Sequence, residues 1–242
     1  MRLFGLIGNK LKHSFSKTYF EKKWLSENIL DCHYDLFELN SIEEVVNILN
    51  SHSNLIGLNV TIPYKNQIIP YLNELSPLAS EIQSVNCIKK IDEKWFGHNT
   101  DAPAFLESLQ HILPSDFNAK ALILGTGGSS KAAQWALKCL GISFDLASTS
   151  GKEITYEELE FSWNPDWKLI INTTPLGMWP NIEDKPLIPY QFINESNYLY
   201  DLIYNPEKTL FLKLGSEQGS RIKNGLEMLH LQANKSWQFW ND

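Results

Sequence analysis

Lys65 stands just beyond a strand-like segment that carries polar groups on one side, the segment GLNVTIPYK at residues 57–65. Side chains alternate across a strand, so Asn59 and Thr61 face one way while the aliphatic residues beside them face the other. Pro63 ends the strand because it has no N–H to donate. Two neutral hydrogen-bonding groups beside an amine that carries a proton could hold a small polar ligand. The alternative is an edge strand followed by a solvated lysine.

Two hydroxyls lie at the start of the first predicted helix. Ser14 and Ser16 point the same way if the chain is extended there, and paired hydroxyl donors suit a carboxylate without a buried counter-charge. Alternatively, Ser16 is only a helix cap and Ser14 only a turn residue. Asn86, in the segment SVNC, and Asp101, in HNTD, add polar groups at predicted strand ends. Asp101 could equally cap a helix.

A glycine-rich turn follows a short apolar strand and opens a helix. The turn is made of Gly125, Thr126, Gly127, Gly128 and Ser129. Glycines at its first and third positions allow a tight turn and let the backbone approach a pyrophosphate at the amino end of the helix. Ser130 replaces the third glycine of the usual pattern, and the alternative is a flexible strand-to-helix turn. The flanking strand and helix favour dinucleotide binding.

The end of the next strand bears on which dinucleotide binds. A carboxylate there would hold a free ribose 2′-hydroxyl and repel a 2′-phosphate. Asp145 lies in mid-strand, whereas the strand exit offers the hydroxyls of Ser148, Thr149 and Ser150, with Lys152 beyond them. Hydroxyls and a cation are compatible with phosphate, so the exit favours NADP over NAD, although it has no arginine to form a bidentate fork.

Strand and helix signals alternate along the chain, which predicts an α/β protein with mostly parallel sheets. We expect a substrate-binding and catalytic domain at 1–100 with a mixed, mostly parallel sheet, joined by the C-terminal helix at 223–242. A Rossmann-like, doubly wound nucleotide domain is expected at 101–222. Strands are predicted at 3–7, 32–39, 55–62, 85–91, 95–97, 121–124, 143–147, 168–172 and 198–202. Helices are predicted at 16–26 with Ser16 as cap, at 41–49 with a capping box of Ser41 and Glu44, after Lys65, and at 101–112, 131–140 and 226–239.

The composition excludes several classes of protein. A formal charge of −7 argues against a nucleic-acid groove, which needs clustered lysine and arginine. Three cysteines lie far apart and six histidines are scattered, so we expect neither a disulfide frame nor a metal site. We see no signal peptide and no apolar run of about 18 residues, which predicts a cytoplasmic protein without a membrane span. The pattern leaves open whether the protein is a monomer or a homodimer.

Eight segments together resemble the shikimate dehydrogenase family, in the family's order and over the whole length. They are the opening at 5–16 with HSFS, GLNVTIPYK at 57–65, SVNC at 84–87, HNTD at 98–101, GTGGSSKAA from Gly125, INTTPLGM at 171–178, YDLIYNP at 200–206 and GLEMLHLQA at 225–233. That family reversibly reduces 3-dehydroshikimate to shikimate with NADPH, in the chorismate pathway of aromatic amino-acid biosynthesis. The resemblance implies the same oxidoreductase activity and small-molecule substrate here.

The resemblance also implies roles for particular residues. Carried over by position, Ser14 and Ser16 would bind the substrate carboxylate, and Lys65 and Asp101 would be the catalytic pair. The ring hydroxyls would be held by Asn59, Thr61, Asn86, Tyr204 and Gln232. The cofactor would lie against the glycine turn, the exit at 148–152, Thr174, Ile203 and Gly225. The active site would then be the cleft between the two domains.

One departure from the family concerns the cofactor. The family commonly has an arginine after the second strand of the nucleotide domain, where this chain has Thr149. Lys152 is the nearby cation that could substitute, so use of NAD remains an alternative. Preference for quinate is another, and a nucleotide-binding regulator that has lost catalysis is a third. The presence of both Lys65 and Asp101 argues against the regulator.

Overall fold

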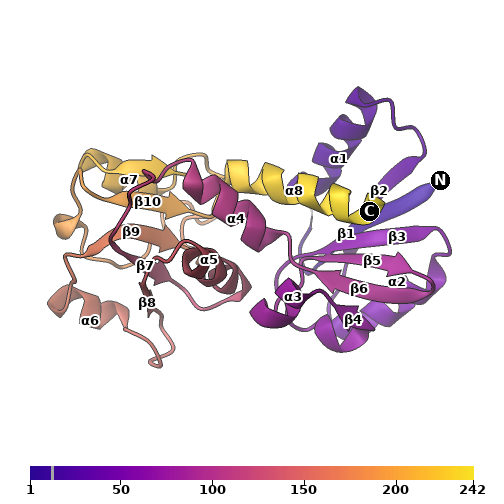
Figure 1. Ribbon diagram of the computed structural model, residues 1–242, viewed down its shortest axis with the longest axis horizontal. Helices are drawn as coiled ribbons and strands as arrows, with labels where there is room; N and C mark the ends of the chain where they lie inside the picture. The colour runs from indigo at the N-terminus through magenta and orange to yellow at the C-terminus, as the bar shows by residue number, and fades with distance from the viewer. Residues whose placement is uncertain (12–13) are drawn as a thin grey trace. The chain divides into compact units, whose positions relative to one another are not determined.

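The computed structural model describes residues 1–11 and 14–242 (Figure 1). His13, part of the HSFS segment, lies outside the described residues. The chain divides into two compact units, one of Met1–Thr100 with Ala233–Asp242 and the other of Asp101–Gln232. The first unit contains a mixed sheet and the second a parallel sheet, each with helices packed against it. The predicted α/β fold class is therefore confirmed.

The sheet of the first unit has the strand order β2-β1-β3-β5-β6-β4. Its strands are β1 (Arg2–Gly8), β2 (Cys32–Glu38), β3 (Leu55–Val60), β4 (Glu74–Leu75), β5 (Cys87–Ile91) and β6 (Lys94–His98). Strand β1 pairs in parallel with both β2 and β3, whereas β5 runs antiparallel to β3 and β6. The two strands predicted at 85–91 and 95–97 correspond to β5 and β6.

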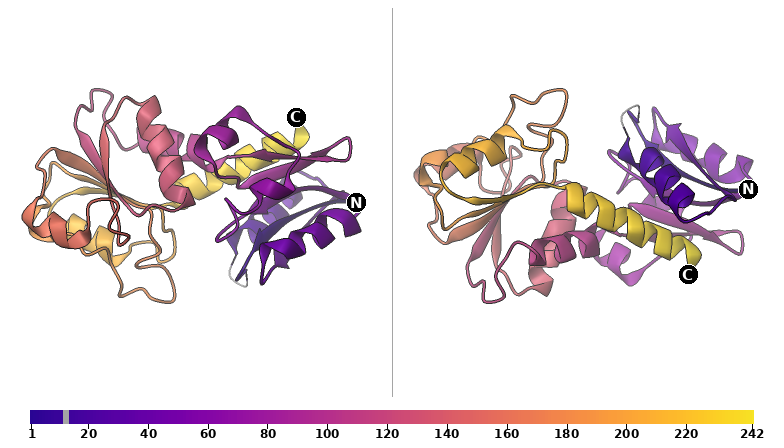
Figure 2. Two further views of the ribbon diagram at one scale, coloured as in Figure 1. Left: turned by 90° about the horizontal axis from the view of Figure 1, so that it is seen from below. Right: turned by 90° about the horizontal axis from the view of Figure 1, so that it is seen from above.

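Helices cover both faces of this sheet. One face packs against the 3₁₀ helices η1 (Ile42–Glu44) and η2 (Ile69–Tyr71) and the helices α2 (Val45–Ser51) and α3 (Pro77–Ile82). The other face packs against α1 (Phe15–Ser26) and the Ala233–Asn241 part of α8, and the right view of Figure 2 shows both helices on that side. Aromatic rings fill this second layer, and burying each one contributes roughly 1.5–3 kcal/mol.

A glycine in β3 makes room for the end of the chain. A Cβ atom on Gly57 would lie 2.3 Å from Nε1 of Trp240, far inside contact distance. Trp240 is buried and donates its indole N–H to the carbonyl of Ile88, 3.0 Å away. The bare backbone of Gly57 is therefore what lets the last turns of α8 lie against the sheet.

The sheet of the second unit is parallel, in the order β11-β10-β9-β7-β8. Its strands are β7 (Lys120–Leu124), β8 (Phe144–Ala147), β9 (Trp167–Asn172), β10 (Tyr198–Asp201) and β11 (Arg221–Lys223). Helices α4 (Asp101–Gln110) and α5 (Gly128–Cys139) and the start of α8 (Leu226–Asn241) pack on one face. On the other face lie α6 (Tyr156–Phe161), the 3₁₀ helix η3 (Tyr190–Phe192) and α7 (Leu210–Glu217). The strand order reverses between β7 and β9, where open α/β sheets bind ligands.

Two predicted helix starts are wrong. Ser14, not Ser16, caps α1, because its hydroxyl accepts from the backbone N–H of Ser16 at 3.3 Å. The expected capping box of Ser41 and Glu44 does not form, since the Ser41 hydroxyl donates to Glu43 at 2.6 Å and a 3₁₀ turn begins there instead. The expected helix directly after Lys65 is a series of turns that leads to η2. The prediction also missed α3, α6, α7, β4 and β11.

Candidate active site

Lys65 lies in the turn that follows β3, and its backbone is fixed from two sides. The backbone N–H of Thr61 donates to the carbonyl of Ile7 at 2.9 Å, which anchors the start of the turn to β1. The carbonyl of Lys65 accepts from the N–H of Val85 at 2.8 Å, which ties the turn to the segment before β5. Lys65 itself is half-buried. A short connection held at both ends therefore presents the lysine.

Alternation along β3 is as predicted. Leu58 and Val60 are buried in the core on the α2 side, whereas Asn59 points to the other side. There the amide of Asn59 accepts from the Tyr34 hydroxyl at 2.9 Å and donates to the hydroxyl of Ser236 at 2.9 Å. Asn59 is thus a polar side chain on the face of the sheet that the Ala233–Asn241 part of α8 covers.

Asn86 is locked to the end of the segment that leads out of β6. Its Oδ1 accepts from the backbone N–H of Thr100 at 2.7 Å, and its Nδ2 donates to the hydroxyl of Thr100 at 2.9 Å. Thr100 directly precedes Asp101 in the chain, and Asp101 is the buried first residue of α4. Lys65 and Asn86 belong to the first unit, and Asp101 to the second.

The two predicted carboxylate ligands differ in their surroundings. Ser14 is partly exposed and caps α1, so its hydroxyl oxygen is engaged while its proton can be donated elsewhere. Ser16 is buried and lies near the phenol of Tyr34. Burial raises the pKa of Tyr34 well above its usual range, and the Ser16 hydroxyl acts against that rise. Tyr34 is therefore a neutral hydroxyl at any working pH.

The glycine turn after β7 fits a dinucleotide. Gly125 has φ +104°, a conformation that favours glycine. A Cβ atom on Gly127 would meet no described atom within 4 Å, so this position faces open space. Gly127 also forms the N-cap of α5, which in the described part of the chain has no side-chain cap. Open space at an uncapped helix start, next to Thr126, Gly128 and Ser129, suits the pyrophosphate of NADP.

The exit of β8 presents hydroxyls without a carboxylate. The Ser148 hydroxyl lies 2.8 Å from that of Ser150 and accepts the backbone N–H of Ser150 at 3.2 Å, while Thr149 and Lys152 are exposed. Asp145 is engaged with other residues, because its Oδ2 accepts from Lys120 at 3.0 Å and from the indole of Trp167 at 2.7 Å. These contacts explain the mid-strand carboxylate as a structural group.

The exits of β9 and β10 are held by a buried acid that the sequence prediction missed. Oδ1 of Asp201 accepts from the amide of Asn172 at 3.1 Å and from the backbone N–H of Ile203 at 3.0 Å. Its other oxygen, Oδ2, accepts from the hydroxyl of Thr209 at 2.6 Å. Burial raises the pKa of Asp201 to about 6, against the lowering effect of these hydrogen bonds. The Asn172 oxygen in turn accepts from Thr174, through its hydroxyl at 2.6 Å and its backbone N–H at 3.0 Å.

Gly225, Tyr204 and Gln232 complete the predicted residues of the second unit. The N–H of Gly225 donates to Ile203, 3.0 Å away, and a Cβ atom on Gly225 would lie 2.1 Å from the carbonyl oxygen of Leu202. Only glycine fits that close approach. Tyr204 is partly buried, which raises the pKa of its phenol. Gln232 donates to the carbonyl of Leu229 at 3.0 Å within α8.

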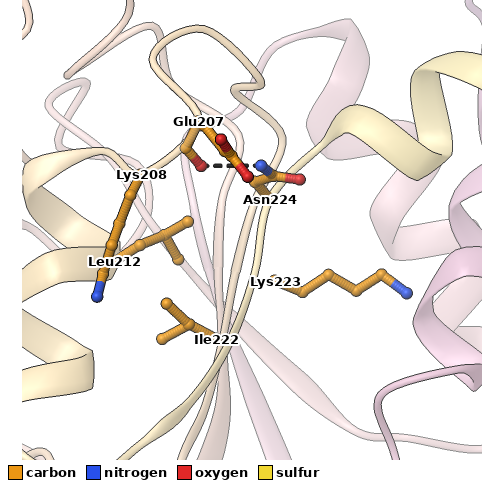
Figure 3. A pocket seen from close by; sticks show the side chains of 6 residues that line it. All are labelled: Glu207, Lys208, Leu212, Ile222, Lys223 and Asn224. Carbon is orange, nitrogen blue, oxygen red and sulfur yellow. Dashed lines mark hydrogen bonds between the residues drawn. The ribbon is translucent and has the colours of Figure 1, made fainter.

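A separate surface pocket of about 560 Å³ is lined by Glu207, Lys208, Leu212, Ile222, Lys223 and Asn224 (Figure 3). Its lining includes none of the described residues that the sequence singled out. The Lys223 ammonium turns away from the pocket and donates to the carbonyl of Ser108 at 2.8 Å (Figure 3). Asn224 is engaged too, since it donates to the carbonyl of Glu207 at 2.8 Å. Two of the polar side chains of the lining, Lys223 and Asn224, are therefore engaged with backbone carbonyls.

Two further searches concern other kinds of site. Within residues 1–11 and 14–242, no three metal-ligating side chains gather in a group that could hold a metal ion. In the same residues, no helix has the length and apolar character needed to cross a membrane.

Comparison with known proteins places the chain in a family. A relative from Caldicellulosiruptor saccharolyticus, shikimate dehydrogenase (NADP(+)), is 35% identical over the whole chain and 93% of its own length. The chain belongs to the shikimate dehydrogenase family. Residues 6–88 match the family model described as the shikimate dehydrogenase substrate binding domain. A shikimate dehydrogenase (NADP(+)) from Pelagibacter ubique is 37% identical, over 99% of this chain and 93% of its own.

Solved structures agree with this membership. Shikimate 5-dehydrogenase from Thermus thermophilus, in complex with NADP(H) and shikimate, matches 99% of this chain and 93% of its own, with a TM-score of 0.88 and 28% identity. Shikimate dehydrogenase 1 from Peptoclostridium difficile matches 100% of this chain and 92% of its own, with a TM-score of 0.86 and 34% identity. The predicted shikimate dehydrogenase family is confirmed, and the chain is an oxidoreductase of a family whose relatives are named for NADP(+).

Proposed function

We propose that this chain catalyses the reversible reduction of 3-dehydroshikimate to shikimate with NADPH, a step of aromatic amino-acid biosynthesis. The observation that supports this most directly is the fixed turn carrying Lys65, which is bonded to Val85, the residue before the locked Asn86, in a chain of the shikimate dehydrogenase family. The chemistry needs a proton donor at the ketone oxygen and hydrogen-bonding groups for a polyhydroxylated acid. The first unit supplies both kinds of group.

Each residue has a role in this proposal. When bound, NADPH supplies the hydride that reduces the ketone. Lys65 donates a proton to the carbonyl oxygen as negative charge develops there, and takes it back in the oxidation direction. Asp101 is the second member of the catalytic pair and accepts a hydrogen bond from the substrate. Ser14 and Ser16 donate to the substrate carboxylate.

Hydroxyl recognition and cofactor binding are divided between further residues. Thr61, Asn86, Tyr204 and Gln232 are proposed to bind ring hydroxyls, whereas the amide of Asn59, which the sequence also predicted for this group, is engaged with Tyr34, Ser236 and the carbonyl of Asn86. The cofactor pyrophosphate is proposed to lie on the amino end of α5, with Thr174, Ile203 and Gly225 near the nicotinamide. The exit of β8 is proposed to receive the 2′-phosphate through its hydroxyls and Lys152. We also propose a cytoplasmic location, which the three free cysteines support.

The test is the formation of NADPH from shikimate and NADP(+), followed by absorbance. We expect turnover that depends on both substrates and a kcat/KM higher for shikimate than for quinate and higher with NADP(+) than with NAD(+). A higher value for quinate or for NAD(+) would change the assigned substrate or cofactor. Binding of NADPH without turnover of either acid would instead favour a regulator and overturn the proposal.

A further inference from the structure

A chain of buried side-chain hydrogen bonds runs beneath the proposed substrate residues of the first unit. It begins at Tyr34 in β2, passes through Asn59 in β3 to Ser236 in α8, and continues to Thr100, whose hydroxyl lies 3.1 Å from that of Ser236. Thr100 then holds Asn86. All five residues are buried, with exposed fractions of 5% or less. Buried polar networks of this kind fix side-chain positions when every member is satisfied.

The orientation of the Asn59 amide follows from its partners. The backbone carbonyl of Asn86, 3.3 Å away, can only accept, so the amide nitrogen of Asn59 must face it. The same nitrogen donates its other hydrogen to Ser236, which leaves the oxygen to accept from Tyr34. Both N–H groups of Asn59 are therefore used within the protein. A single lone pair on Oδ1 is all that this side chain could offer a ligand.

Asn86 is held but keeps a donor in reserve. The backbone N–H of Thr100 can only donate, so Oδ1 of Asn86 must face it, and Nδ2 gives one hydrogen to the Thr100 hydroxyl. The second Nδ2 hydrogen has no partner among the described residues. Asn59 grips the backbone carbonyl of Asn86, and Ser236 contacts the hydroxyl of Thr100 that holds its side chain. The two asparagines thus have different capacities for a ligand.

We propose that Tyr34, Asn59 and Ser236 are positioning residues for substrate binding, which act by holding Asn86 and Thr100 rather than by touching the substrate. This inference rests on the proposed function, because it concerns the same substrate site. A preset Asn86 amide meets a substrate hydroxyl without losing rotational freedom on binding. Removing the hydrogen bond on either side of Asn59, from Tyr34 or to Ser236, lets its amide turn and weakens its hydrogen bond to the carbonyl of Asn86.

The test compares Tyr34→Phe and Ser236→Ala with a matched control, Tyr19→Phe. Tyr19 likewise donates a hydrogen bond from its phenol to an asparagine, the Oδ1 of Asn234 at 2.8 Å, but this bond links α1 to α8 and lies outside the chain of buried hydrogen bonds. KM for shikimate, KM for NADP(+), kcat and the thermal unfolding midpoint are measured for each. We expect Tyr34→Phe and Ser236→Ala to raise KM for shikimate about tenfold, the effect of one lost hydrogen bond, and to leave KM for NADP(+) unchanged. Tyr19→Phe should lower the midpoint to a similar extent and leave both KM values unchanged.

A double variant decides whether Tyr34 and Ser236 both act through Asn59. Combined, Tyr34→Phe and Ser236→Ala should raise KM for shikimate well below the product of the two single effects, because the second change disturbs an amide that is already released. If the parent enzyme oxidises shikimate and all three single variants have the same KM for shikimate as the parent, the positioning role is overturned. A KM for shikimate in the double variant that equals the product of the two single effects would show that Tyr34 and Ser236 do not both act through Asn59. A parent without shikimate turnover would instead remove the proposed function.

Discussion

The substrate half of the candidate site is made of side chains, whereas the cofactor half is made largely of backbone. In the first unit, Asn59 and Asn86 are fixed by hydrogen bonds to buried neighbours. In the second unit, Gly125 and Gly127 offer a turn and open space at a helix start. Recognition by side chains depends on the residue type at each position. Recognition by the backbone requires only that the side chains near the ligand are small enough to leave it room. We therefore expect the cofactor half to tolerate Thr149 in place of the family's arginine more readily than the substrate half would tolerate a substitution of Asn86.

The largest expected effect tests the substrate half. Lys65→Ala should lower kcat for shikimate oxidation by about 100- to 10,000-fold, the usual contribution of a general acid–base group, with little change in KM. Lys94→Ala, which changes an exposed lysine paired with Glu74, is the control. A rise in KM alone would make Lys65 a binding residue.

The next effect concerns the buried acid that supports the cofactor half. Asp201 has its pKa raised by burial to about 6, so on raising the pH from about 4 the unfolded chain ionises first and stability falls until about pH 6. Asp201→Asn removes this loss. The difference in unfolding free energy between variant and parent should shift by roughly 2 kcal/mol in the variant's favour between pH 4 and pH 7. Urea unfolding at each pH measures it, and a constant difference would contradict the raised pKa.

Glu227 provides a control of opposite sign. Burial acts to raise its pKa, but hydrogen bonds from Lys223, His111 and Ser108 outweigh burial and lower the pKa to about 2. Its contribution is present above its ordinary pKa of about 4 and is lost as the pH falls toward 2. Glu227→Gln should therefore lose stability relative to the parent above about pH 4, and the difference should shrink as the pH falls toward 2, which urea unfolding at each pH measures.

Two glycine substitutions separate backbone shape from ligand space. Gly127→Ala should leave the unfolding midpoint of the free protein nearly unchanged, since its Cβ meets no described atom within 4 Å, yet raise the Kd for NADPH about tenfold or more by filling the pyrophosphate space. Gly125→Ala should instead destabilise the fold by about 1–2 kcal/mol, because φ is +104° and the Cβ would lie 2.8 Å from the Thr173 hydroxyl. Protein fluorescence on titration with NADPH, and thermal unfolding, measure the two effects. An unchanged Kd in Gly127→Ala would place the pyrophosphate elsewhere.

The smallest expected effect concerns the exit of β8 and tests whether the cofactor half tolerates Thr149 in place of the family's arginine. Thr149→Arg should tighten NADPH binding about tenfold, because a guanidinium can bind the 2′-phosphate with two charge-assisted hydrogen bonds, and should leave NADH binding unchanged. Lys152→Ala should weaken NADPH binding a few-fold by the same reasoning. Equal changes for both dinucleotides would show that this exit does not contact the phosphate.

Local patterns in the sequence were enough to find the strand exits. Polar residues after apolar runs located Lys65 and the glycine turn, because neighbouring positions decide strand ends and turns, whereas Asn86 directly precedes β5. The position of the helix cap at Ser14 rather than Ser16 depends on one turn of backbone, which spacing alone does not settle. The missed helix α6 did have a signal, the capping box of Thr155 and Glu158.

The supporting residues could not be found in this way. Tyr34 is 25 residues from Asn59, and Ser236 is 177 residues from it, so their hydrogen bonds exist only once the sheet and α8 have formed. Asp201 reaches Asn172 across 29 residues for the same reason. Such contacts depend on the register between distant segments, which no local pattern encodes.

The space that Gly57 leaves for Trp240 has a consequence for the order in which the two units fold during synthesis. The first unit lacks the Trp240 ring that occupies the space next to Gly57 until residues 233–242 leave the ribosome, whereas the second unit is one continuous stretch, Asp101–Gln232. We therefore expect the unit later in the sequence to finish folding first during synthesis, and residues 1–100 to wait for residues 233–242 with part of an aromatic surface uncovered.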